Sequence, residues 1–425
     1  MRAKRINIWW IRRDIRLIDN AVLNEAAQED GEIVPVYILD PSMFSGKGQE
    51  KKLSFIFRQL WDLNRRLSTF GTAIIVFHGK STDVFKWLKS QFSQAKIFTS
   101  LELGYVGQQT LQEAKKYFQT ETVFEGYLLN FDRVRSKEGK VFRTFFHFKN
   151  AAYKWIEKMV WEKKENLQFK WFSLSTPSLY RIDGQWIEKL DFSLESLGLR
   201  EIQLCHEGAI RSPEELLERF EMILPSYSNL RDFPAKNATS LLSVHLRYGT
   251  ISVREVLKWA LEKPNSTKFI DEILWREFFS YLLYHYPESE FQDFRKDYKK
   301  IWVKPSKEDL RKLENAQIGI PIIDAGLKQL FLEGFVHNRV RMVIASFLTK
   351  DLRWDWRIGE RLFAQHLIDY DPALNVGNWQ WNAGVGVDPR SMYRKFNPFL
   401  QAEKFDHEGE YINRYLKASP VGYQS

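Results

Sequence analysis

The sequence has 425 residues, which is too long for one ordinary hydrophobic core, so we expect two domains. Hydrophobic residues make up 44% and charged residues 28%, a balance that indicates a folded globular protein and excludes a disordered one. The formal net charge of +9 favours a polyanionic partner such as nucleic acid, and the single cysteine, Cys205, excludes internal disulfides.

Short apolar runs alternate with helix-period segments over residues 1–125. Strands are predicted at 6–11, 32–39, 72–78, 96–100 and 121–125, with helices at 53–67 and 81–92 between them. Right-handed crossovers between parallel strands would give a doubly wound α/β domain. Neither G-x-G-x-x-G nor G-x-x-x-x-G-K-[ST] is present, so a ligand crevice at this sheet is expected by analogy only.

The pattern changes twice after this domain. Gly, Ser, Pro and Lys interrupt it over residues 126–205, which predicts a long connector. From 206 to 425 the periodicity indicates an all-helical domain. Helices bounded by Pro, Gly or Asn are predicted at 214–224, 266–286, 321–335 and 338–352. In the third, Pro321 fits the first helical position and Asp324 the first turn.

Two of these predicted helices carry polar side chains at helical spacing. Glu272, Trp275 and Arg276 share a face, which taken alone favours a surface Glu272–Arg276 ion pair over a carboxyl and a ring that line a pocket. Asn338 and Met342 repeat this spacing on the later helix. The second pattern favours a pocket more strongly, because Asn is buried only when it is paired.

Acidic residues follow this second helix in the segment LIDYDPALN. Asp369 and Asp371 are candidate partners for Arg341, which lies on the same helix face as Asn338, and either carboxylate could equally cap the next helix. The segment continues as NVGNWQWNAG, in which Trp379 and Trp381 are two positions apart. Residues i and i+2 of a helix lie about 200° apart, so the two rings point to opposite sides. Tryptophans so placed are either core filler or rings that face a flat partner.

The same stretches resemble the photolyase/cryptochrome family. IWWIRRDIRLIDN resembles the opening strand and loop of that family, and RDFPAKNATSLLSVHLRYGTIS resembles its flavin-phosphate segment. DEILWREF, HNRVRM and DYDPALNVGNWQW follow its helical domain in order. The resemblance covers essentially the whole chain, and it is greatest to class I cyclobutane pyrimidine dimer photolyases. It implies an antenna-type α/β domain over 1–125, an interdomain connector over 126–205, and a helical FAD-binding and lesion-binding domain over 206–425.

The resemblance implies FAD as the cofactor, active as FADH⁻, within the helical domain. Hydroxyl and backbone groups of the 239–243 run would hold its phosphates, and Asn375 matches the residue that faces the flavin N5. A second antenna chromophore, of folate or deazaflavin type, stays an open alternative. The cofactor contacts implied by motif position are Tyr227, Thr239, Ser240, Leu241, Leu242, Ser243, Phe269, Arg341, Asp369, Tyr370, Asp371 and Asn375.

The resemblance also assigns the remaining site residues. Trp302, Trp356 and Trp379 would carry electrons to the flavin. The catalytic lining of the substrate cavity would be Glu272, Trp275, Asn338, Met342 and Trp381. The DNA contacts would be Arg231, Glu272, Trp275, Arg276, Asn338, Arg339 and Trp381. No metal is expected, because the eight histidines show no ligand spacing.

The resemblance implies a DNA photolyase, a carbon–carbon lyase that repairs cyclobutane pyrimidine dimers by light-driven electron transfer from FADH⁻ to a flipped-out dimer. Its partner would be DNA that carries UV-induced pyrimidine dimers. No apolar run reaches about 18 residues, so we expect a soluble cytoplasmic monomer with no membrane contact. The alternatives are a cryptochrome-type photoreceptor, a (6-4) photolyase, or a flavin-dependent redox or DNA-binding protein without photochemistry. Asn338 favours cyclobutane dimers, since (6-4) relatives typically carry histidine there.

Overall fold

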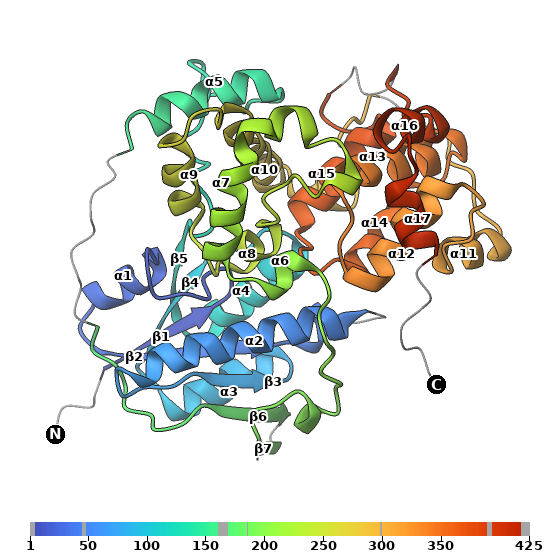
Figure 1. Cartoon of the computed structure of the whole chain (residues 1–425). Helices are drawn as coiled ribbons and strands as arrows, with labels where there is room; N and C mark the ends of the chain where they lie inside the picture. Colours follow the sequence, from blue (N-terminus) through green and yellow to red (C-terminus); the bar gives the residue numbers. More distant parts are fainter. Residues whose placement is uncertain are drawn as a thin grey trace. The chain divides into compact units, whose positions relative to one another are not determined.

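The computed structural model describes residues 5–44, 48–159, 169–184, 186–297, 300–388 and 393–417. The chain forms two compact units, and its path through them can be followed in Figure 1. Unit 1 consists of Met1–Asn130, Trp155–Gln203 and His245–Trp259. Unit 2 consists of Phe131–Lys154, Leu204–Val244 and Ala260–Ser425. Each unit therefore takes part of the segment that was expected to be a connector.

Unit 1 is built on a seven-stranded sheet with the order β5-β4-β1-β2-β3-β6-β7. The first five strands are parallel and confirm the predicted α/β sheet: β1 (Ile6–Ile11), β2 (Glu32–Leu39), β3 (Ile75–His78), β4 (Lys96–Ser100) and β5 (Gln119–Val123). Central strand β1 pairs with β2 and β4, so that Ile8 lies opposite Val34 and Ile97. Every residue of β1 is buried, as expected for a parallel strand covered on both faces.

Two more strands come from the segment expected to be a connector. Strand β6 (Ser178–Asp183) pairs in parallel with β3, and β7 (Trp186–Leu190) pairs antiparallel with β6. Their short, partly exposed runs lack the continuous apolar pattern of β1 and β2, because they lie at one edge of the sheet. The sequence pattern alone therefore did not identify them as strands.

Helices connect the five parallel strands β1 to β5. They are α1 (Ala21–Gln28), α2 (Gln49–Ser68), α3 (Ser81–Gln91) and α4 (Tyr105–Tyr117), with most of α8 (Ser243–Tyr248) and α9 (Val253–Leu261) also in unit 1. The predicted apolar stripe of α2 is confirmed, since its Leu, Ile and Phe positions from Leu53 to Leu67 are buried. Helix α3 begins at Ser81, as predicted.

Unit 2 is helical in its described residues, which confirms the predicted fold class. Its helices are most of α5 (Phe145–Ile156), then α6 (Glu207–Ile210), α7 (Pro213–Leu230), α10 (Thr267–His285), α11 (Lys307–Glu314), α12 (Pro321–Glu333), α13 (Asn338–Ser346), α14 (Trp356–His366), α15 (Pro372–Ala383), α16 (Pro398–Phe405) and α17 (Glu410–Leu416). A π-helix over Phe347–Asp351 follows α13. Ser212 and Glu215 cap α7 reciprocally, and Pro321 opens α12 as predicted.

One hydrophobic cluster holds the C-terminal helices of unit 2 together. It draws buried side chains from α12, α13, α14, α15 and α17, which lie near one another in Figure 1. Helices α14 and α15 contact each other closely, and α15 also contacts α10. No helix within the described ranges is long and apolar enough to cross a membrane.

Candidate active site

Helix α15 places its two tryptophans in different surroundings. Trp379 is 3% exposed and packs on α14, where its ring centroid lies 5.3 Å from that of Phe363 at an interplanar angle of 84°. Gly359 of α14 leaves the space that this indole fills. Trp381 is instead only partly buried and lies 6.4 Å from the ring centroid of Phe396. The two rings thus point to different sides of α15, as their spacing predicted.

The three tryptophans assigned to electron transfer pack within one hydrophobic cluster. Trp379 and Trp356 belong to its buried core, and Trp302 packs against that core while partly exposed. The Trp356 indole N–H donates to Asp293 at 2.8 Å. The Lys300 ammonium lies 4.7 Å from the centroid of the Trp302 ring. Burial lowers the pKa of Lys300 to about 8, although Asp293 acts in the opposite direction.

Asn375 is fixed one turn before Trp379 on α15. Its side-chain nitrogen donates to the Glu360 backbone carbonyl at 3.1 Å and to the Glu360 carboxylate at 3.0 Å. The Tyr370 hydroxyl donates to the same carboxylate at 3.4 Å. Asn375 and Glu360 are each 8% exposed. Both hydrogens of the amide therefore have an acceptor on α14, which leaves the amide oxygen for a ligand.

The two acidic residues before α15 have different roles. Asp369 accepts two contacts from the Arg341 guanidinium, at 3.1 and 3.3 Å, while the Arg341 Nε donates to the Val336 carbonyl at 2.7 Å. Asp371 caps α15 by accepting from the Ala373 N–H at 3.0 Å. Of the two alternatives, pairing with Arg341 therefore applies to Asp369, and capping of the next helix applies to Asp371.

The 239–243 run, assigned to the cofactor phosphates, forms a turn that leads into α8. Leu241 has a φ of +58° and is 5% exposed, a left-handed conformation that is uncommon for leucine. The Ser240 hydroxyl accepts from the Leu242 N–H at 3.5 Å. Before this run, Tyr227 on α7 is buried and its ring centroid lies 6.0 Å from that of Phe269. Burial raises the pKa of the Tyr227 hydroxyl above its ordinary value.

Glu272 on α10 pairs with a distant arginine. Its Oε1 lies 2.5 Å from Arg231 Nη1, and Lys268 lies 3.6 Å away. Arg276, the partner favoured by spacing, is 9% exposed and pairs with the fully buried Glu277 at 3.1 Å. A fully buried carboxylate needs a counter-charge more than a partly exposed one does, which accounts for this choice. The surface Glu272–Arg276 pair is therefore not formed.

Trp275 packs against two aromatic rings. Its ring centroid lies 3.7 Å from that of Phe145 with the planes 9° apart, and 5.6 Å from that of Phe279. Phe279 in turn contacts the backbone of α15 at Gly377, where an added Cβ would lie 2.4 Å from the Phe279 ring. Trp275 and Trp381 therefore belong to two helices that touch. Phe145 was missed from the sequence, because it lies within the segment read as a connector.

The start of α13 carries the remaining predicted contacts. Asn338 is exposed, and its side-chain nitrogen lies 3.9 Å from the Met342 sulfur. Arg339 pairs with Asp232 at 2.8 Å. His337 caps the helix by accepting from the Arg339 N–H at 3.2 Å, and burial lowers the pKa of its imidazole to about 4. His337 is therefore neutral at pH 7, as its acceptor role requires.

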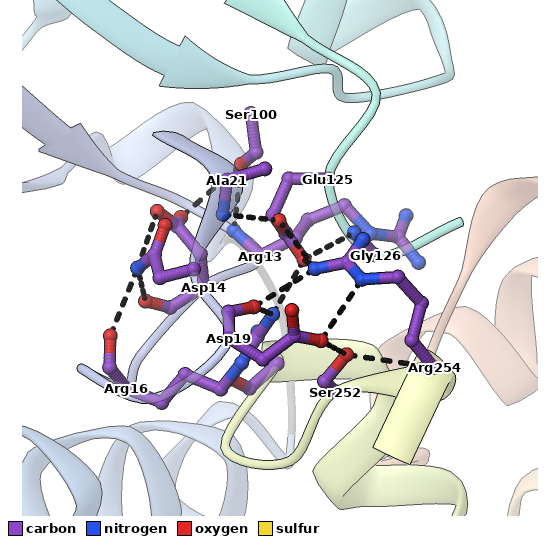
Figure 2. Close-up of polar contacts among 12 residues, drawn as sticks. Arg13, Asp14, Arg16, Asp19, Ala21, Ser100, Glu125, Gly126, Ser252 and Arg254 are labelled. Atoms are coloured by element: carbon purple, nitrogen blue, oxygen red, sulfur yellow. Dashed lines mark hydrogen bonds and ion pairs between the residues drawn. The ribbon is translucent and has the colours of Figure 1, made fainter. Parts of the chain in front are cut away.

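A second charged cluster lies in unit 1, at the carboxyl end of β5 (Figure 2). Glu125 is fully buried and lies 2.5 Å from Arg16 and 3.1 Å from Arg254 of α9. Arg254 also lies 2.9 Å from Asp19. Burial acts to raise the pKa of Glu125, but the two guanidinium groups more than offset it and lower this pKa to about 2. These ion pairs attach the segment 245–259 to the sheet of unit 1.

Polar groups gather near the start of α15. The partly exposed Arg341 pairs with the buried Asp369 and lies 5.3 Å from the centroid of the Phe335 ring, and the Asn375 amide is held by Glu360. The Trp381 indole N–H is buried and has no hydrogen-bond partner among the described residues. A buried donor that lacks an acceptor favours a ligand that supplies one. Within the same residues, no group of three or more His, Cys, Asp or Glu side chains is arranged to hold a metal ion.

The chain matches two family models. Residues 7–166 match the model for DNA photolyase, and residues 269–419 match the FAD binding domain of DNA photolyase. The deoxyribodipyrimidine photo-lyase of Agrobacterium fabrum is 32% identical over 433 residues, which cover 96% of this chain and 86% of that protein. The deoxyribodipyrimidine photo-lyase of Salmonella typhimurium is 31% identical and covers 96% of this chain and 88% of its own length.

Solved structures share the fold over nearly the whole chain. An archaeal photolyase from Sulfolobus tokodaii with two FAD molecules has a TM-score of 0.78 at 30% identity, over 97% of this chain and 90% of that one. A bacterial class III photolyase from Agrobacterium tumefaciens has a TM-score of 0.79 at 30% identity, over 98% of this chain and 87% of that one. A Synechocystis cryptochrome, at 24% identity and a TM-score of 0.79, shows the shared fold alone. The chain therefore belongs to the photolyase/cryptochrome family.

Proposed function

We propose that this protein is a DNA photolyase that uses FAD to split cyclobutane pyrimidine dimers under blue light. The observation that supports this most strongly is the arrangement of α15, which carries the fixed amide of Asn375, the buried ring of Trp379 and, on another side, the partly exposed ring of Trp381. One helix thus combines a cofactor-facing group, an electron-transfer ring and a substrate-facing ring.

The proposed cofactor site lies in unit 2. Arg341, Asp369 and Asn375 would contact the flavin ring, and the 239–243 run would contact the phosphates. Bound FAD in its reduced form supplies the light absorption and the electron that opens the cyclobutane ring. The protein contributes orientation. The Glu360 contacts hold the Asn375 amide in one direction, and the hydrophobic packing on α14 holds the Trp379 ring in place.

The proposed substrate site uses α10 and the start of α13. The Glu272 carboxylate is an acceptor, which suits the imide N–H of a pyrimidine. Trp275 and Trp381 offer ring faces to an extruded dimer, and base–aromatic stacking returns about 1–3 kcal/mol per base against the cost of flipping. One face of Trp275 is already covered by Phe145, so its other face would be the one that serves the dimer.

The carboxamide of Asn338 supports cyclobutane dimers over (6-4) photoproducts, because an amide is not an acid that could deliver a proton. Relatives of similar identity include a class III photolyase. Membership of the class I group is supported by the sequence motifs DEILWREF, HNRVRM and DYDPALNVGNWQW.

The experiment that tests this proposal is a repair assay under blue light. Purified, flavin-loaded protein is mixed with an oligonucleotide that contains one cyclobutane thymine dimer, and a (6-4) oligonucleotide and a dark sample serve as controls. We expect light-dependent loss of the cyclobutane dimer only. Flavin photoreduction without repair would contradict the proposal in favour of a photoreceptor, and turnover in the dark would favour a non-photochemical flavoprotein.

A further inference from the structure

Two arginines expected to contact DNA phosphates are each paired with a carboxylate of the same unit. Arg231 Nη1 lies 2.5 Å from Glu272 Oε1, and Arg339 Nη2 lies 2.8 Å from Asp232 Oδ2. Arg231 Nε also lies 3.9 Å from Asp232, which joins the two pairs. We call Arg231, Asp232, Glu272 and Arg339 the paired arginine cluster. It comes from three separate segments of unit 2 and has no net charge.

Within the paired arginine cluster, the carboxylates are more accessible than the guanidinium groups. The side chains of Arg231 and Arg339 are 14% and 15% exposed, whereas those of Glu272 and Asp232 are 28% and 38% exposed. An anion that approaches from solvent therefore meets the carboxylates first. To take over the Nη atoms that form these pairs, it must displace a carboxylate.

Aromatic rings hold the two arginines in place. The Arg231 guanidinium lies 5.4 Å from the centroid of the Tyr227 ring, and the Arg339 guanidinium lies 4.4 Å from that of Phe405. Tyr227 is itself 5% exposed. The cations are thus fixed by packing, while the carboxylates are the more exposed members of each pair. This geometry therefore allows one anion to replace another on each arginine while the guanidinium group stays in place.

Glu272 also lies close to a second cation, Lys268. Lys268, one helical turn earlier on α10, lies 3.6 Å from its carboxylate and is 47% exposed. A carboxylate released from Arg231 therefore keeps a neighbouring cation, which reduces the cost of the exchange. The same release leaves its oxygens available to accept a hydrogen bond.

We propose that Glu272 and Asp232 act as internal substitutes for DNA phosphates, and that a phosphate displaces Glu272 from Arg231 when damaged DNA binds. This inference rests on the proposed function. Bidentate contact with phosphate replaces the carboxylate on the guanidinium group, and the freed carboxylate accepts the imide N–H of the dimer. Undamaged DNA must break the same ion pair but offers no flipped base to Glu272. The cluster thereby penalises undamaged DNA and couples backbone contact to recognition of the dimer.

The test measures binding of undamaged DNA, because the proposed contact between Glu272 and the dimer plays no part in that binding. Full-length protein is kept in the dark and titrated into a short, fluorescein-labelled, undamaged single strand, and anisotropy is followed from about 50 to 200 mM salt. We expect Glu272→Gln to bind this strand roughly two- to five-fold more tightly, the range set by loss of one partly exposed ion pair. Asp232→Asn should act in the same direction through Arg339.

Glu221→Gln is the matched control, because Glu221 is 50% exposed in unit 2 and forms an ion pair with Lys263 at 2.6 Å. It removes the same charge without touching the paired arginine cluster and should leave binding unchanged. Urea midpoints of all variants show that each is folded. Unchanged or weaker binding by Glu272→Gln, or equal tightening by Glu221→Gln, would overturn the inference. Failure of the proposed function would appear separately, as absence of light-dependent repair by the unmodified protein.

Discussion

Replacement of Gly359 by alanine tests the packing that places Trp379 against α14. A Cβ added at Gly359 would lie 2.0 Å from Cη2 of Trp379, 2.5 Å from Cζ3 and 2.8 Å from Cζ2. Carbon atoms in contact are normally about 3.5–4.0 Å apart, so the helix and the ring would have to separate by roughly 1.5 Å. Trp379 is 3% exposed and belongs to the buried cluster of unit 2, so its ring has little room to move.

Two effects of opposite sign determine the stability of Gly359→Ala. Alanine in place of glycine inside a helix favours folding by about 0.5–1 kcal/mol. Overpacking in a filled core costs about 1–3 kcal/mol, and the 2.0 Å approach to a rigid indole puts this site in the upper part of that range. We therefore expect a net loss of about 1–2 kcal/mol in the free energy of unfolding, the difference between these two contributions.

The assay is chemical unfolding of four proteins: the parent, Gly359→Ala, Trp379→Phe and the double variant. Phenylalanine removes most of the atoms that the new Cβ would meet, so the double variant should be more stable than the sum of the single effects by about 1 kcal/mol or more. If Gly359→Ala instead raised stability by the usual helix gain, Trp379 would not pack on α14. The assignment of the Trp379 ring to the α14 side of α15 would then be wrong.

Two further predictions concern the buried side chains of Glu125 and Asn375. Glu125→Gln should lower the free energy of unfolding by about 3–5 kcal/mol in urea titrations, because the buried Arg16 would lose its anion and the partly exposed Arg254 would keep only Asp19. In the parent protein the pKa of Glu125 is lowered to about 2 on folding, so its stabilising contribution is complete above its unfolded pKa and is lost as pH falls from about 4.5 to about 2. The thermal midpoint of the parent protein should therefore decrease as the pH is lowered through that window, and the midpoint of Glu125→Gln should decrease less. If the midpoints of the two proteins decreased equally, the ion pairs of Glu125 would be contradicted. Asn375→Asp would place a second carboxylate against Glu360 and remove both donated hydrogen bonds, so thermal unfolding should show a loss that grows as pH rises above about 4. A loss independent of pH would argue against this contact.

Local pattern was sufficient for the strands with a continuous apolar run and for the side-chain directions within helices, but not for β6 and β7. Strands β1, β2 and β4 begin and end where the apolar runs do, and the apolar stripe of α2 is buried as its spacing predicts. The opposite orientations of Trp379 and Trp381 also follow from spacing alone. These features depend on the fixed periods of strand and helix, which a short window of sequence contains in full.

Partner choice depended on contacts between distant segments. Glu272 pairs with Arg231, 41 residues away, and not with Arg276 on its own helix face. Trp275 stacks on Phe145 from a segment with no clear periodicity. In both cases the outcome depends on which groups are desolvated when the segments meet, and the cost of burying a charge or a ring face is a property of the assembled neighbourhood. No window of sequence contains that neighbourhood, so only the tertiary structure could decide it.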